Sequence, residues 1–149
     1  MKRPLAYAII MVLLLGVAAW WVTDYRQFDF NEAPYNECHI QSIRVLKQTQ
    51  TVEISNPEQY TDIVLSMLRE HTYRRTSESE MSGDSTLEIS FLVSRQNTPI
   101  VFIIGEQGDI AITDVTTHRY KLGKNAKTAK ELYNRIYTLL KDQLPPELQ

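Results

Sequence analysis

The sequence predicts an α+β protein: an N-terminal transmembrane helix, then an antiparallel sheet of about five to seven strands covered by two amphipathic helices. Three observations carry this prediction: a long apolar run near the N-terminus, a series of short segments that alternate between apolar and polar residues, and two segments with apolar residues at helical spacing. Short polar turns between strands favour an antiparallel meander, and two helices on one face complete a two-layer domain. The predicted divisions are a transmembrane helix over residues 1–23, a juxtamembrane linker over 24–37 and the α+β domain over 38–149.

The apolar run, "LAYAIIMVLLLGVAAWWV", covers residues 5–22 and contains no charged residue. As a helix it would be about 27 Å long, close to the ~30 Å hydrocarbon thickness of a bilayer. Lys2 and Arg3 precede it. By the positive-inside rule, they keep the N-terminus in the cytoplasm and place the rest of the chain outside.

The end of this run leaves two alternatives open. In the first, the segment is a signal-anchor, and Trp20 and Trp21 lie at the extracytoplasmic membrane interface, where amphipathic rings are favoured. In the second, the small residues before Trp20 form a signal-peptidase site, and cleavage after Ala19 releases a secreted protein. The anchor is the prediction, because the apolar run continues past the cleavage site.

The linker has little periodicity. Two alternatives stay open for its aromatic residues Tyr25, Phe28 and Phe30: they lie on the membrane surface, or they cover an edge of the domain core.

The strands are predicted from apolar alternation and from the turns between them. Residues 99–105, "PIVFIIG", form a continuous apolar run, which predicts a central strand covered on both faces. The other predicted strands cover residues 38–46, 51–55, 71–77, 86–94, 110–115 and 118–122.

The first domain helix is expected to begin at an N-cap, Ser55 or Asn56, with Pro57 in its first turn. Its apolar residues recur at the spacing of one buried stripe. They are Tyr60, Ile63, Val64, Met67 and Leu68.

The last helix is expected to begin with a capping box of Thr128 and Glu131 and to stop before Pro145. Glu131 and Arg135 have the spacing of a helical ion pair. The predicted apolar stripe consists of Ala129, Leu132, Tyr133, Ile136, Tyr137 and Leu140.

Composition argues against a nucleic-acid partner. Of the 16 basic residues 14 follow the apolar run, as do all 18 acidic ones, which leaves a balance of −4. Nucleic-acid-binding domains are normally strongly basic. The single cysteine, Cys38, excludes an intrachain disulfide.

The sequence contains no recognisable catalytic motif, and we predict no catalytic, cofactor or metal site. Cys38 and His39 are adjacent, but neighbouring side chains of a strand point to opposite faces and do not meet. His39, His71 and His118 are widely separated and lack metal-ligand spacing. There is no Gly-x-Ser-x-Gly elbow and no glycine-rich phosphate loop.

Five basic residues within residues 119–130, with no acidic residue among them, form the candidate interaction surface. Lysines near a helix N-terminus oppose the helix dipole slightly, so this run has no evident folding benefit. Two alternatives stay open: a contact for anionic headgroups, an anionic cell-wall polymer or an acidic partner, or a solvated strand end and helix start. The residues are Arg119, Lys121, Lys124, Lys127 and Lys130.

The segments "VEISNPEQYTDIVLSMLRE", "YRRTS", "HRYKL" and "AKELYNRI" resemble, in their order, small extracytoplasmic domains of Gram-positive bacteria. Such domains follow a signal or anchor and are mostly uncharacterised, so the resemblance implies a location and no site. We therefore expect a membrane-anchored binding or accessory module that contacts another envelope protein or an anionic envelope component. The alternative is a secreted binding or inhibitor protein released after Ala19.

Overall fold

The computed structural model describes residues 3–24, 27–76, 81, 83–94, 99–113, 117–122 and 126–149. Within these ranges, the side chains of residues 3–6, 20–24, 117, 126 and 127 lie outside the description.

The domain is α+β with an antiparallel sheet, as predicted, but the described residues form eight strands instead of five to seven. Seven of them correspond to the predicted segments, and the eighth lies in the predicted linker. The order across the sheet is β1-β4-β8-β7-β6-β5-β2-β3, and all neighbours are antiparallel. The strands are β1 (Gln27–Phe28), β2 (Cys38–Lys47), β3 (Gln50–Glu53), β4 (Tyr73–Thr76), β5 (Ser85–Val93), β6 (Pro99–Gly105), β7 (Ile110–Thr113) and β8 (Thr117–Leu122).

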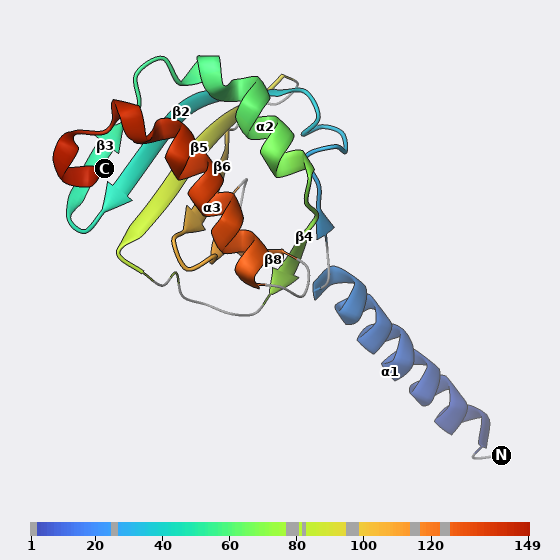
Figure 1. Cartoon of the computed structure of the whole chain (residues 1–149). Coiled ribbons are helices and arrows are strands. Elements are labelled where there is room, and N and C mark those ends of the chain that lie inside the picture. The colour runs from blue at the N-terminus through green and yellow to red at the C-terminus, as the bar shows by residue number, and fades with distance from the viewer. Residues whose placement is uncertain are drawn as a thin grey trace.

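Strands β5 to β8 form a meander, and the crossover from β3 to β4 passes over one face of the sheet. This crossover contains the 3₁₀ helix η1 (Pro57–Tyr60) and the helix α2 (Thr61–Arg69). The helix α3 (Ala126–Leu140) follows β8 and lies on the same face as α2 (Figure 1). Two short 3₁₀ helices, η2 (Lys141–Gln143) and η3 (Pro146–Leu148), end the chain.

The N-terminal helix α1 covers Arg3–Asp24 and extends away from the sheet and its two covering helices (Figure 1). Judged over the residues that the structure describes, no helix is both long and apolar enough to cross a membrane.

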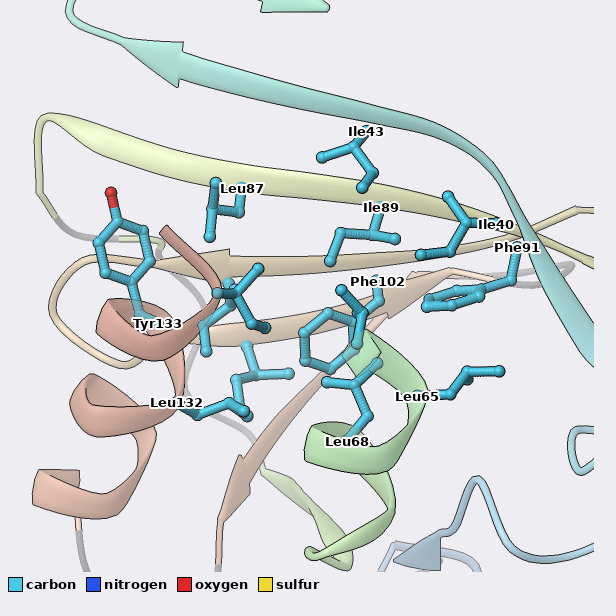
Figure 2. Packing of buried hydrophobic residues seen from close by; sticks show 14 of the residues in the cluster. Ile40, Ile43, Leu65, Leu68, Leu87, Ile89, Phe91, Phe102, Leu132 and Tyr133 are labelled. Atoms are coloured by element: carbon cyan, nitrogen blue, oxygen red, sulfur yellow. The ribbon is translucent and has the colours of Figure 1, made fainter. Parts of the chain in front are cut away.

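The core lies between the sheet and the two helices. Strand side chains such as Ile89 and Phe102 meet Leu68 of α2 and Leu132 of α3 (Figure 2). Burial alternates strictly along β5, which confirms the predicted inward face of that strand. Each buried side chain of this size contributes about 1.5–3 kcal/mol relative to an exposed one.

The prediction that β6 is covered on both faces is wrong. Ile100, Phe102 and Ile104 are buried, while Val101 and Ile103 are only half-buried. Both helices pack on one face, so the second face of β6 has no covering layer among the described residues. The sequence of β6 is apolar on both faces, but the fold covers only one of them.

The start of α2 also differs from the prediction. Asn56 has a left-handed backbone (φ 50°) and its side chain makes no capping hydrogen bond, and the chain first forms η1 before α2 begins at Thr61. The predicted apolar stripe is wrong at one position: Ile63 is 46% exposed, and Leu65 is buried with Val64 and Leu68 instead.

The apolar stripe predicted for α3 is confirmed, with Tyr137 half-buried and the other members buried. The capping box is wrong, because α3 begins at Ala126 and Thr128 lies inside the helix. Arg135 does not pair with Glu131; its guanidinium donates to both carboxylate oxygens of Glu70, at 2.6 and 3.0 Å. The planar guanidinium favours such two-bond contacts, and this hydrogen bond lowers the pKa of Glu70.

Of the two alternatives for the aromatic residues of the predicted linker, packing on the domain core is confirmed for Phe28 and Phe30. Phe28 lies in β1 and is buried, and Phe30 is fully buried. The Phe30 ring centroid lies 5.4 Å from that of Phe91, 5.8 Å from that of Tyr73 and 6.0 Å from that of Phe102. Tyr25 lies outside the described residues. The segment predicted as a linker therefore contributes one strand and two rings to the core.

We predict that Phe30→Ala lowers the free energy of unfolding by about 3–5 kcal/mol, because it removes a fully buried ring and leaves a cavity. Denaturant unfolding followed by near-ultraviolet circular dichroism measures the change. Ile63→Ala is the matched control, since it truncates a large apolar side chain that is 46% exposed; its expected effect is within about 0.5 kcal/mol. Equal effects of the two substitutions would show that Phe30 is not part of the core.

Candidate functional site

The candidate site is the outer face of the sheet, which we define as the face opposite α2 and α3. Cross-strand partners share a face, so the strand register assigns each side chain to one side. In β5 and β6 the side chains that alternate with the buried ones lie on the outer face. Their cross-strand partners on the neighbouring strands lie on the same face. The outer face includes Gln27, Arg44, Glu53, Arg74, Glu88, Leu92, Val101, Ile103, Ala111, Arg119 and Lys121.

Three basic residues lie together on the outer face of β4 and β8, and we call them the basic end. Arg74 lies directly opposite Lys121, and Arg119 lies opposite Thr76 on the same strand pair. Like charges directly opposite each other disfavour strand pairing, so the repulsion between Arg74 and Lys121 adds nothing to the stability of the sheet. The side chains of Arg74 and Arg119 form no ion pair with any described residue.

Arg119 also covers part of the sheet surface. Its cross-strand partner Ala111 is fully buried, although it lies on the outer face. The longer side chains of Arg119 and Ile103 flank this alanine on the two neighbouring strands. Arginine stems commonly lie along apolar surface in this way while the guanidinium stays in water.

The middle of the outer face is apolar. Leu92, Val101 and Ile103 are half-buried on the central strands β5 and β6, and we call them the apolar centre. The outer face of an antiparallel sheet with one solvated side is usually polar. An apolar centre with charged surroundings is typical of a protein-binding surface.

The far end of the face, on β2 and β3, carries paired charges. Arg44 donates to Glu88 across β2 and β5 at 3.1 Å, and Glu53 lies opposite Arg44 on β3. This end therefore contrasts with the basic end in having a carboxylate on either side of its arginine.

The structure divides the predicted interaction surface. Arg119 and Lys121 lie on the outer face of β8, whereas Lys130 lies on α3 and donates to Oε1 of Gln107 at 2.7 Å. Lys124 lies outside the described residues, and Lys127 lies in α3 with its side chain outside them. Trp20 and Trp21, the predicted interface anchors, lie in α1, but the structure does not describe their side chains.

Sequence reasoning missed Arg74 as a member of the basic end. The only available signal was the polar outer face expected for residues 71–77. That signal does not show which strand β4 pairs with. β4 lies 41 residues before β8 along the chain, and the crossover from β3 to β4 brings it beside β8.

Cys38 and His39 point to opposite faces, as predicted. Cys38 packs against the core, and His39 is exposed. Burial raises the pKa of the Cys38 thiol to about 11, against a smaller opposing effect of nearby Arg69. Among the described residues no group of histidine, cysteine and carboxylate side chains is arranged to hold a metal ion.

The buried hydroxyl pair of Ser85 and Tyr133 has a structural role. The two oxygens lie 2.6 Å apart beneath α3. Burial raises the pKa of Tyr133, so its hydroxyl stays protonated and satisfies Ser85.

Comparison with protein-family models, with curated proteins and with solved structures finds no match to this chain.

We predict that Cys38 is unreactive at neutral pH, because its thiol stays protonated until about pH 11 in the folded state. Since the folded pKa exceeds the unfolded value of 9.0, the thiol contributes stability that is complete below pH 9.0 and is lost as the pH rises towards 11. Thiolate absorbance measured against pH checks this, with the denatured protein as control. A folded-state thiolate near pH 7 would contradict it.

Proposed function

We propose that this protein is a membrane-attached accessory module. In this proposal α1 is the transmembrane anchor, and the α+β domain lies outside the cytoplasm and binds another envelope protein through the outer face of its sheet. The observation that carries the proposal is the exposure of α1.

The described part of the domain does not cover the apolar side chains of residues 7–17 of α1. From Tyr7 to Val17 its large apolar residues are 52% to 69% exposed. Successive helix residues are rotated by about 100°, so an unbroken exposed run surrounds the whole helix. A helix that is apolar all round belongs in a protein interior or in lipid. The run of consecutive exposed residues is Ile9, Ile10, Met11, Val12, Leu13, Leu14 and Leu15.

The sequence supports the direction of insertion. The charge-free run continues beyond the described side chains to residue 22, and Lys2 and Arg3 precede it. The positive-inside rule keeps such an N-terminus in the cytoplasm, which leaves the domain on the extracytoplasmic side.

The apolar centre supports a protein partner for the domain. Leu92, Val101 and Ile103 lie on the face that no described helix covers, between the basic end and the Arg44–Glu88 ion pair. An apolar patch with a charged rim is the usual composition of a specific interface.

We predict that Leu13→Arg detaches the protein from membranes. A charged residue at the centre of a membrane helix costs about 2.5–3.5 kcal/mol, so the membrane-bound to free ratio should fall about a hundredfold. The measurement is the fraction retained after a carbonate wash. Ile63→Arg is the matched control, an exposed apolar position outside α1. A mature soluble species that begins at Trp20 would contradict the anchor and favour the secreted alternative.

We predict that Ile103→Glu weakens co-purification of a partner protein from detergent-solubilised membranes by about tenfold or more, because central interface positions dominate binding. Ile63→Glu on α2 should leave it unchanged, and circular dichroism should show that both variants are folded. Equal recovery with Ile103→Glu would exclude the apolar centre as the interface.

A further inference from the structure

We infer that the basic end docks on anionic lipid headgroups beside the point where α1 leaves the membrane, and so fixes the orientation of the domain. This inference rests on the proposed attachment through α1. It assigns a ligand to Arg74 and Arg119 that is distinct from the protein partner of the apolar centre.

The chain path brings the basic end close to α1. Asp24 ends the helix and Gln27 begins β1, so three steps of chain separate them and their Cα atoms are at most about 11 Å apart. Gln27 pairs with Arg74, one strand spacing of about 5 Å further on. Arg74 therefore lies within roughly 16 Å of the end of α1.

The direction of the strands brings Arg119 to the same end. Since β1 and β4 are antiparallel, Gln27, the first residue of β1, lies on the Thr76 side of Phe28. Thr76 pairs with Arg119. In Figure 1 the end of β4 lies beside the end of α1, which agrees with this path.

The charges fit an anionic surface. Arg74 is exposed and Arg119 half-buried, and neither forms an ion pair with a described residue. Arg74 lies within about two screening lengths of the end of α1, since that length is about 8–10 Å at physiological ionic strength, and Arg119 lies on the neighbouring strand. Arginine pairs readily with phosphate through two parallel hydrogen bonds.

The far end of the same face supplies an internal control. Arg44 lies on β2, five strands from β4 in the sheet order, and its guanidinium already donates to Glu88. Lipid docking at the basic end should therefore leave the chemical reactivity of the Arg44 side chain unchanged.

The test is arginine modification by phenylglyoxal, mapped by mass spectrometry on the full chain reconstituted into vesicles. With phosphatidylglycerol vesicles, Arg74 and Arg119 should react at least about fivefold more slowly than with phosphatidylcholine vesicles, whereas Arg44 should react equally with both. High salt should remove this protection, because it screens the attraction.

Substitution tests the same point. The preference for anionic over zwitterionic vesicles should fall about fivefold for each arginine replaced in Arg74→Gln and Arg119→Gln. The charge-preserving pair Arg74→Lys and Arg119→Lys should restore most of the preference, and Arg44→Gln should leave it intact.

The outcomes separate this inference from the proposed function. Binding to both kinds of vesicle without lipid-dependent protection would overturn headgroup docking and leave the anchor intact. Failure to bind either kind would overturn the anchor as well. Protection that appears in native membranes but not on pure anionic vesicles would overturn headgroup docking and assign the basic end to an acidic protein.

Discussion

The fold depends on the burial of Tyr73 at the edge of the core. Its ring is fully buried against Phe28, Phe30 and Phe102, and its hydroxyl donates to the carbonyl of Leu68 at 2.9 Å. This single residue connects β4 to β1, to the central strand β6 and to the end of α2. A buried hydroxyl without a partner would be costly, so the hydrogen bond fixes where α2 ends and where β4 begins.

The position of β4 determines both where the basic end forms and where α1 joins the sheet. Because β4 pairs with β8, Arg74 comes to lie opposite Lys121 and next to Arg119. Because β1 pairs with β4, the chain leaves α1 at this same edge of the sheet. The end of α1 and the basic end are therefore neighbours through one strand, although they come from three separate parts of the sequence.

One-sided coverage decides which face of the sheet stays open to solvent. Both amphipathic helices are used on the inner face, where Leu68 and Leu132 complete the core. The chain ends there as well: Leu144 and Leu148 join the core, and the carbonyl of Leu148 accepts hydrogen bonds from Lys47 and Tyr137. The described helices thus leave the outer face uncovered, and no layer formed by the described residues covers its apolar centre at Val101 and Ile103.

The sequence by itself determined the element types and most inward faces, because hydrophobic periodicity is a local property. It identified the alternation of Leu87, Ile89 and Phe91, the stripe of α3 and the opposite orientations of Cys38 and His39. Only the tertiary structure decided the sheet order, the packing of Phe30 and the pairing of Arg135 with Glu70. It also placed Arg74 with Arg119 and separated Lys130 from them. These features depend on contacts between residues far apart in the chain. A local sequence pattern does not determine which strand lies next to another after a crossover, or which face of an apolar strand the helices cover.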